Sequence, residues 1–501
     1  MTMLVPDLLR EQAAKVPDKT AIIVDGIAQM TYGEWEAASN RLARALVARG
    51  VTPGTRVGLM FTNNDAHRFS IAYMAVHKAG GVGVPLNIRL APNELKYIAE
   101  HSEMGVLLYG SDNDGLDAVR AAAAPTSTPK LVMGVRAQDD VMASQDSSTF
   151  QVERSDNDLA DILYTSGTTG QPKGVACEHG NITFMTSQSV SQFFKGLTML
   201  HAVPVFTFAG AHAMMLIPLR GGMTTVIQPK FDAARYLELV EQHKVAMAFT
   251  VPSMVLLMLE QAKRGLTSLK LLLYGTAPMP EMAIKQLPEL FPSAMLVNMY
   301  GLTEGGTMVC SLPPHEAQKR PTSVGKPVPP AEIKIVGEDG TQMPAGEPGE
   351  IFLRSPVKQR SYYKDEAATQ ATWTNDGWLR TGDIGYVDAD GYLFLVDRKK
   401  DLIIRGGFNI TAAEVENALL EHPKVREAAV IGVPHKVLGE DTKAFVVIAS
   451  GEQVSPAELE TFCRERLADY KVPRNYEFIT ALPRNALGKV LKRDLRDGAK
   501  S

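Results

Sequence analysis

The sequence predicts an α/β fold in which helices cover mainly parallel sheets. Short apolar runs rich in β-branched residues alternate with helical patterns over the first several hundred residues, and this order is typical of strands joined by crossover helices. The chain is 501 residues long, which at about 150 residues per domain corresponds to roughly three folding units. We therefore expect several domains rather than one hydrophobic core.

The clearest predicted helix runs from Tyr32 to Arg49. Apolar side chains recur in it at three-to-four residue spacing, and Gly50 follows as a stop signal. A second helix is expected over Asn64–Lys78. Predicted strands, each bounded by turn-forming residues, are Arg56–Phe61, Gly105–Tyr109, Leu131–Val135, Asp161–Tyr164 and Leu271–Tyr274.

The sequence pattern changes twice towards the C-terminus. From about Gly325 to Val396, short strands are broken by Pro, Gly and Asp every eight to twelve residues, which predicts a small antiparallel β-unit. After Asp401 strands and helices alternate again. We therefore expect a large N-terminal domain over residues 1–397, with a β-rich subdomain at about 325–396, and a C-terminal domain over 398–501.

Composition excludes several classes of protein. Hydrophobic residues make up 45% of the chain and the net charge is −4, from 52 basic and 56 acidic side chains, so the basic excess needed for nucleic acid is missing. Apolar runs stop at about six residues, against roughly 20 for a membrane helix, so no membrane span is expected. Three well-separated cysteines and no signal-peptide pattern predict a cytoplasmic protein.

A segment rich in hydroxyls and glycine follows the predicted strand that ends at Tyr164. It reads TSGTTGQPKG over residues 165–174. Glycine lets backbone N–H groups converge on an anion, hydroxyls donate to its oxygens, and lysine adds charge, so this composition indicates a phosphate loop. It is not a Walker A loop, because Lys173 lies between Pro172 and Gly174. The residues assigned to phosphate binding are Thr165, Ser166, Gly167, Thr168, Thr169, Gly170 and Lys173.

Together with four later motifs, this loop resembles the adenylate-forming (ANL) superfamily, which includes acyl-CoA and aryl-CoA ligases. The stretch YTSGTTGQPKGV is similar to the family's phosphate-loop signature. It is followed in the family's order by YGLTE at 300–304, WLRTGD at 378–383, DRKKD at 397–401 and PRNALGKV at 483–490. The resemblance implies a large α/β N-terminal domain and a mobile α+β C-terminal domain that rotates about a hinge at Lys400.

The resemblance also implies a two-step reaction that uses ATP, Mg²⁺ and coenzyme A. A carboxylate attacks the α-phosphorus of ATP to give acyl-AMP and pyrophosphate, and a thiol then attacks the acyl carbon and releases AMP. In the first step, Mg²⁺ and a cation on the developing charge reduce the repulsion between two anions. The resemblance assigns Lys489 as that cation, Glu304 as the magnesium-binding carboxylate and Thr303 as a donor to the α-phosphate.

Other positions that match the family's motifs are expected to hold the nucleotide. Tyr300 would flank the adenine, and the carboxylate of Asp383 can accept hydrogen bonds from both ribose hydroxyls. Arg398 would reinforce the ribose or phosphate contact. The remaining candidates are Gly275, Thr276, Ala277 and Pro278, which resemble a backbone shelf for the adenine, and Asn298 and Gly301.

The segment after the hinge supplies the expected CoA contacts. Gly406 and Gly407 would line the path of the pantetheine arm, because glycine lets a ligand pass close to the backbone. Arg405 and Lys436 are basic candidates for the phosphates of the CoA nucleotide, on composition alone.

The predicted acyl pocket departs from many relatives, because Thr207 stands where they have a histidine gate. We expect the acyl pocket to be lined by Phe206, Thr207, Phe208, Met214, Gly305, Gly306 and Met308. The two glycines after Glu304 leave space, and these stretches contain no Lys or Arg to pair with a second substrate carboxylate. We therefore expect a bulky apolar or aryl monoacid rather than acetate or a dicarboxylate.

Three alternative functions stay open from the sequence. The chain could be a stand-alone enzyme that loads a carrier protein, or a ligase specialised by Thr207 for thioesterification of a supplied acyl-AMP. It could also be a non-catalytic protein that binds nucleotide or acyl-AMP, although Lys489, Glu304 and Asp383 are all present. The sequence identifies neither the acid nor the oligomeric state, and a homodimer stays open.

Overall fold

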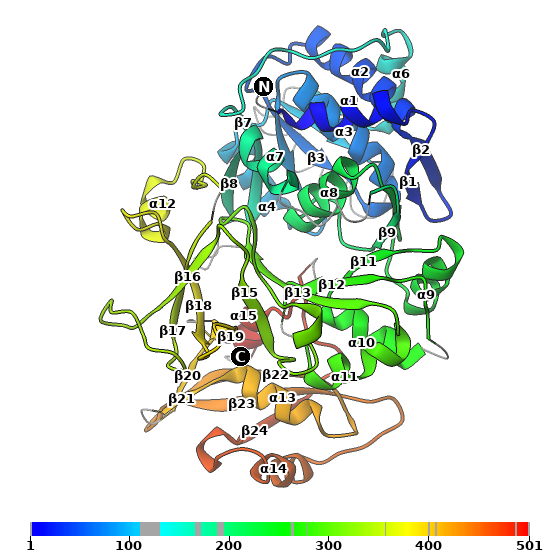
Figure 1. Cartoon of the computed structure of the whole chain (residues 1–501). Helices are drawn as coiled ribbons and strands as arrows, with labels where there is room; N and C mark the ends of the chain where they lie inside the picture. The colour runs from blue at the N-terminus through cyan, green and yellow to red at the C-terminus, as the bar shows by residue number, and fades with distance from the viewer. Residues whose placement is uncertain are drawn as a thin grey trace.

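The fold consists of three β-sheets with helices packed against them. The computed structural model describes residues 3–110, 131–165, 172–187, 195–261, 265–277, 279–355, 357–398, 401–405, 408–485 and 488–498. Figure 1 shows the N-terminal α/β layers in blue and cyan at the top, green and yellow strands in the middle, and the orange C-terminal strands at the bottom. The predicted α/β class is confirmed. No helix among the described residues has the length and apolar character to cross a membrane.

A six-stranded sheet lies near the N-terminus, with the order β6-β5-β3-β4-β7-β8. Its neighbours are parallel except for β7 and β8, so the predicted phosphate loop connects two antiparallel strands. The strands are β3 Arg56–Met60, β4 Val82–Pro85, β5 Val106–Tyr109, β6 Leu131–Met133, β7 Leu159–Thr165 and β8 Lys173–Glu178. The third predicted strand is shorter than expected, because Val135 already begins a helix.

A 13-stranded sheet forms the middle of the molecule, with the order β16-β17-β18-β19-β15-β14-β13-β12-β11-β9-β10-β1-β2. Its centre, from β1 to β13, is parallel, and the strands from β14 to β19 continue it in antiparallel register. The strands are β1 Thr20–Val24, β2 Ala28–Thr31, β9 Thr198–His201, β10 Thr224–Ile227, β11 Met247–Thr250, β12 Leu271–Gly275, β13 Met295–Leu302, β14 Thr307–Ser311, β15 Ser323–Pro327, β16 Glu332–Val336, β17 Gly349–Arg354, β18 Leu379–Val387 and β19 Leu393–Arg398.

A five-stranded sheet contains the C-terminal strands and lies below β13 and β15 in Figure 1. Its order is β21-β20-β23-β22, and β24 pairs with β23. The strands are β20 Ile403–Arg405, β21 Phe408–Ile410, β22 Val425–His435, β23 Gly439–Ile448 and β24 Asn475–Phe478.

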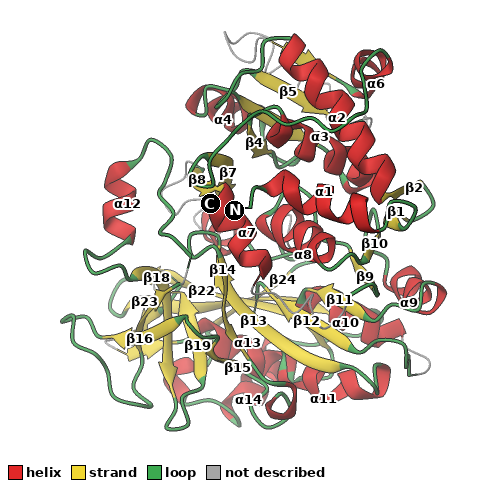
Figure 2. Ribbon diagram, turned by 45° about the horizontal axis from the view of Figure 1, so that its top comes forward, coloured by secondary structure: helices red, strands yellow, loops and turns green. Residues whose placement is uncertain are grey.

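The helices cover the sheets on both sides (Figure 2). The predicted helix at Tyr32 is confirmed: the side chain of Thr31 accepts from the backbone N–H of Glu34, and that glutamate reaches back to Thr31, so two backbone donors are satisfied. The α-helices are α1 Val5–Lys15, α2 Tyr32–Ala48, α3 Ala66–Lys78, α4 Pro92–His101, α6 Val135–Ala143, α7 His179–Ser187, α8 Met214–Arg220, α9 Ala233–Gln242, α10 Pro252–Gln261, α11 Glu281–Leu290, α12 Glu366–Thr372, α13 Ala412–Leu420, α14 Pro456–Arg464 and α15 Lys492–Gly498. Short turns of other helix types are η1 Asn63–Asp65, the π-helix η3 Phe208–Ala213, η4 Pro314–Glu316 and η5 Asp469–Lys471.

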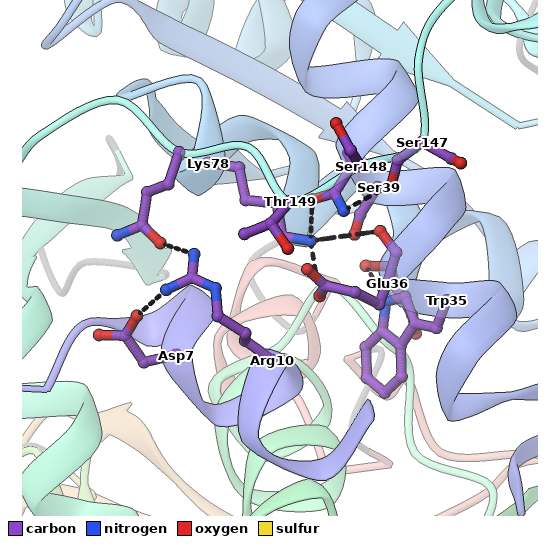
Figure 3. Close-up of polar contacts among 12 residues, drawn as sticks. Asp7, Arg10, Trp35, Glu36, Ser39, Lys78, Ser147, Ser148 and Thr149 are labelled. Atoms are coloured by element: carbon purple, nitrogen blue, oxygen red, sulfur yellow. Dashed lines mark hydrogen bonds and ion pairs between the residues drawn. The ribbon is translucent and has the colours of Figure 1, made fainter. Parts of the chain in front are cut away.

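A buried lysine joins α2 to α3 (Figure 3). The ammonium of Lys78, which is fully buried, donates to Glu36 Oε2, Ser39 Oγ and Asn40 Oδ1, each at 2.7 Å. Burial lowers the pKa of Lys78 to about 8, because desolvation disfavours the charged form. All three N–H groups are therefore matched to acceptors, and the charge has a carboxylate beside it.

Replacement of Lys78 by methionine should destabilise the protein strongly. The change leaves the Glu36 carboxylate without its cation, and breaking a buried pair costs about 3–5 kcal/mol of unfolding free energy. The double variant Glu36→Leu/Lys78→Met should recover most of that loss. Thermal and urea unfolding measure both, with the exposed Lys96→Met as control. Equal stability of Lys78→Met and Lys96→Met would contradict this account.

Candidate active site

A tyrosine–carboxylate pair joins β13 to β18 at the predicted nucleotide site. Tyr300 Oη donates to Asp383 Oδ2 at 2.7 Å, and both residues are buried. Burial and the neighbouring carboxylate raise the pKa of Tyr300, so its phenol stays protonated and donates at neutral pH. Asn298, two residues earlier, donates to the carbonyl of Ser323 on β15 at 3.0 Å. The structure therefore brings the YGLTE and RTGD motifs into direct contact.

Glu304 lies in the turn between β13 and β14, beside a tyrosine that was not predicted. Tyr362 Oη donates to Glu304 Oε1 at 2.8 Å. The ammonium of Lys173 lies 5.1 Å from the centre of the Tyr362 ring, within the range of a cation–π contact. Thr165 pairs with Lys173 across β7 and β8. The described ends of the phosphate loop thus meet the turn that carries Glu304.

The segment 360–363 follows the edge of β8 as an additional stretch of extended chain. The N–H of Ala176 donates to the carbonyl of Ser361 at 2.9 Å, and the N–H of Tyr363 donates to the carbonyl of Gly174 at 2.7 Å. Because alternate residues of extended chain point to one side, Arg360 and Tyr362 both face the turn at 303–306. The sequence analysis missed both, since no motif marks them; their spacing of two in QRSYY is the only signal.

Arg360 is 2% exposed and packs against residues assigned to the acyl pocket. Its Nη1 donates to the carbonyl of Thr303 at 2.8 Å, and its guanidinium lies 5.6 Å from the centre of the Phe208 ring. A Cβ placed on Gly306 would lie 2.8 Å from Arg360 Nε. The expectation that both glycines leave open space is therefore wrong at Gly306, where the guanidinium fills it. The predicted pocket stretches themselves contain no Lys or Arg, but the fold brings Arg360 against them from a distant part of the sequence.

The other pocket candidates divide between the site and the core. Phe206 is buried, and Phe208 packs edge-on against His212. Thr207 Oγ1 accepts from the N–H of Gly210 at 3.0 Å and donates to the carbonyl of Pro204 at 2.8 Å, so its hydroxyl closes the first turn of η3. Met214 is buried in the core cluster around β9 to β12. Gly305 packs towards Leu353 and Leu379, and the side chain of Met308 lies outside the described part of the structure.

A buried polar cluster lies behind Phe208. Asp161 on β7 accepts from Tyr73 Oη at 2.6 Å and from His212 Nε2 at 2.8 Å, and its other oxygen lies 3.2 Å from His77 Nε2. Burial opposes ionisation, but the two histidines hold the pKa of Asp161 below its ordinary value. Asp161 is therefore held by its own buried neighbours, with Oδ2 hydrogen-bonded and Oδ1 close to His77.

The predicted adenine shelf follows β12. A Cβ at Gly275 would lie 2.6 Å from the carbonyl of Met299 on β13, so only glycine fits there. The next residue, Thr276, has φ 71° and is exposed, which is strained backbone for a β-branched residue. Ala277 is described as well, whereas Pro278 lies outside the described residues. Strain of this kind is typical of functional sites.

The turn with Lys489 lies against the larger part of the molecule. The N–H of Lys489 donates to Asn485 Oδ1 at 2.9 Å, and the N–H of Asn485 donates to the carbonyl of Lys489 at 2.8 Å. A Cβ at Gly488, whose φ is 78°, would lie 3.1 Å from the hydroxyl of Ser253 at the start of α10. The turn is thus closed on itself and docked where β11 ends.

The basic candidates for CoA binding occupy different surroundings. Arg405 Nε pairs with Asp441 at 2.7 Å and its Nη1 donates to the carbonyl of Tyr470 at 3.0 Å. Lys436 is exposed in the turn between β22 and β23. The remaining predicted positions lie outside the described residues (Ser166, Gly167, Thr168, Thr169, Gly170, Lys400, Gly406 and Gly407), as does the side chain of Arg398.

Comparison with known proteins decides the family. The model of the AMP-binding enzyme family matches residues 9–363, and that of the AMP-binding enzyme C-terminal domain matches residues 414–489. The chain belongs to the AMP-binding enzyme family. This finding confirms the ANL resemblance and identifies an AMP-forming acid–CoA ligase that works through an acyl-AMP.

Relatives in the AMP-binding family match nearly the whole chain. The long-chain-fatty-acid–CoA ligase FadD13 of Mycobacterium tuberculosis is 34% identical over 98% of this chain and 97% of its own length. A feruloyl-CoA synthase of Amycolatopsis is 36% identical over 97% of both chains. A fatty acid–[acyl-carrier-protein] ligase, ScoC of Streptomyces coeruleorubidus, is 34% identical over 96% of this chain and 93% of its own.

A solved relative shows the same architecture with an adenylate bound. The o-succinylbenzoate-CoA synthetase MenE of Bacillus subtilis, in complex with the acyl-adenylate intermediate OSB-AMP, superposes with a TM-score of 0.86 at 33% identity, covering 98% of both chains. The same synthetase has been solved with ATP and a magnesium ion, with a TM-score of 0.85 at 32% identity and coverage of 99% of both chains.

Replacement of Thr276 by glycine should stabilise the protein. Glycine adopts φ near 71° without strain, so relief of the backbone should exceed the extra entropy of the unfolded chain and raise the unfolding free energy by up to about 1 kcal/mol. The neighbouring Ala277 has no positive φ to relieve, so Ala277→Gly should lower the unfolding free energy by about 0.5–1 kcal/mol. Thermal unfolding measures both, and a loss of stability in both variants would show that Thr276 is not strained.

Proposed function

We propose that the chain joins a bulky apolar or aryl carboxylic acid to CoA through an acyl-AMP intermediate. The observation that carries this proposal is the placement of two phenol–carboxylate pairs along one segment of chain: Tyr300–Asp383 at the end of β13, and Tyr362–Glu304 in the turn that follows, with Lys173 beside the Tyr362 ring. The aromatic side chains of Phe206 and Phe208 favour an apolar acyl group, and the names of relatives include both fatty and feruloyl acids.

Each charged residue has a distinct task in the proposed first step. Asp383, fixed by Tyr300, would accept the ribose hydroxyls and hold the nucleotide. Thr303 would donate to the α-phosphate, and Lys489 would place positive charge on the oxygens as the acid carboxylate attacks. Stabilisation of this kind acts on charge that develops in the transition state, where fixed donors are worth most.

The donor set of the described residues fits Mg²⁺. Glu304 is a half-buried carboxylate held by one hydrogen bond from Tyr362, which leaves its other oxygen available. Mg²⁺ is commonly bound by one or two carboxylates together with substrate phosphates rather than by an all-protein cage. The ion would neutralise phosphate charge when ATP is bound, and a relative has been solved with both.

CoA is the acceptor that we propose, with a carrier protein as second candidate. Among relatives of similar identity, FadD13 is named as a CoA ligase and ScoC as a carrier-protein ligase, so identity alone does not choose between them. A panel of aliphatic and aryl acids with ATP, read by pyrophosphate release and by thioester formation with CoA or with a phosphopantetheinyl carrier, tests both. Pyrophosphate release without any CoA thioester would reject CoA as the acceptor.

Replacement of Lys489 by alanine should remove adenylation and spare the second step. Loss of a cation on the developing charge should lower the rate of pyrophosphate release by about 10² to 10³, equivalent to roughly 3–4 kcal/mol. Thioester formation from supplied acyl-AMP and CoA should stay within about threefold of the parent. The control is Arg493→Ala, which removes an exposed cation from the same segment. Parallel loss of both half-reactions would reject the assignment.

Replacement of Tyr362 by phenylalanine should raise the Mg²⁺ requirement. The change removes the hydroxyl that positions Glu304, and loss of such a supporting hydrogen bond typically weakens metal binding 10- to 100-fold. Pyrophosphate release at varied MgCl₂ should show half-maximal rate at about tenfold higher Mg²⁺, with kcat at saturating Mg²⁺ little changed. Tyr363→Phe, at the next position, serves as control. The same Mg²⁺ dependence in both variants would show that Tyr362 does not support the metal site.

A further inference from the structure

Arg360 carries a buried positive charge with one edge of its guanidinium unused. Nη1 is bonded to the carbonyl of Thr303, whereas Nε and Nη2 are buried and have no hydrogen-bond partner among the described residues. An unpaired buried charge is costly, and proteins keep such charges only with a partner. Two strong donors of Arg360 are therefore buried without a hydrogen-bond acceptor among the residues that the structure describes.

The surroundings hold this guanidinium in place but do not neutralise it. Trp373 Nε1 donates to the backbone carbonyl of Arg360 at 2.9 Å, and the ring of Phe208 and the backbone of Gly306 lie against the side chain. No carboxylate of the described residues forms an ion pair with it. Glu304 is bonded to Tyr362, and Asp161 is bonded to Tyr73 and His212.

We propose that Arg360 binds a second carboxylate, carried by the acyl part of the acid substrate. Nε and Nη2 lie on one edge of the planar guanidinium, and that edge matches the two oxygens of a carboxylate in a bidentate pair. Gly306 lies at this edge and the Phe208 ring centre lies 5.6 Å from the guanidinium carbon, and both residues were predicted to line the acyl pocket. The proposal rests on the proposed ligase function and adds a specificity determinant to it.

The consequence is a preference for acids with an anionic far end on an otherwise apolar skeleton. A site built to hydrogen-bond a polar group rejects an analogue that lacks it far more strongly than an apolar pocket rejects a missing methylene, because the buried donors are left unpaired. We thus expect a dicarboxylic acid to be used better than the monoacid with the same skeleton, at least where the spacing of the two carboxylates suits the site.

Matched pairs of acids test this preference on the parent enzyme. The pairs are adipate and hexanoate, suberate and octanoate, and 2-succinylbenzoate and 4-oxo-4-phenylbutanoate, each measured as kcat/KM for pyrophosphate release. We expect the diacid to exceed its monoacid by about 10²-fold or more in at least one pair. A preference for the monoacid in every pair would overturn the proposal and leave the ligase function intact.

Variants at Arg360 assign the preference to this side chain. Arg360→Gln should lower kcat/KM for the preferred diacid by about 10²- to 10³-fold and lower that of the matched monoacid by at least about tenfold less. Arg360→Lys, which keeps the charge but not the bidentate edge, should restore part of the diacid activity. Arg354→Gln, on the exposed end of β17, is the matched control and should change neither.

Other roles for Arg360 predict different results. An equal loss with diacid and monoacid, together with a raised KM for ATP, would mean that the guanidinium serves the nucleotide or the fold, and would overturn the proposal. If Arg360→Gln does not fold, the parent's pairs and Arg360→Lys still decide. If no acid releases pyrophosphate, the proposed ligase function is wrong. The Arg360 assignment is then tested separately by calorimetric titration of the parent with suberate and with octanoate. Equal binding of the two acids would overturn that assignment.

Discussion

Two backbone hydrogen bonds between β8 and the segment 361–363 connect parts of the molecule that otherwise belong to separate sheets. β8 is the edge of the six-stranded sheet, and the segment lies between β17 and α12, beyond the strands of the 13-stranded sheet. Because each bond is made by the main chain, the register is fixed, and with it the direction of alternate side chains. The position of Tyr362 beside Glu304, and of Arg360 beside Thr303, depends on this junction.

Charge pairing around the site follows from burial. Asp383 and Asp161 are both nearly inaccessible to solvent, and each accepts a hydrogen bond from a tyrosine whose pKa is raised by burial. A phenol that stays protonated can donate to a carboxylate, and a hydrogen bond of this kind favours the ionised form of its acceptor. Each tyrosine therefore supplies a fixed donor to a buried carboxylate in this region.

The sequence predicted the elements whose signals are local. The helix at Tyr32 was found because its apolar repeat and the glycine that follows it lie close together in the sequence, and a phosphate loop is predicted because the composition over ten residues is unusual. Arg360 was missed because its contacts, Thr303 and Phe208, are 57 and 152 residues away, and nothing in QRSYY marks a strand pairing with β8. The absence of Lys and Arg from the predicted pocket stretches could not reveal Arg360 for the same reason: residues distant in sequence can be neighbours in space at a junction of two sheets.

The hydroxyl of Thr207 has a structural role at the position where the family resemblance places a gate. It accepts from the N–H of Gly210 and donates to the carbonyl of Pro204 at the start of the π-helix η3. The residue at the family's gate position therefore also caps the first turn of this helix. A histidine at this position would have to replace both bonds or let the turn rearrange. Exchange of Thr207 for the family's histidine would therefore alter the local fold as well as the side chain, because the turn would lose the hydroxyl that accepts from Gly210 and donates to Pro204.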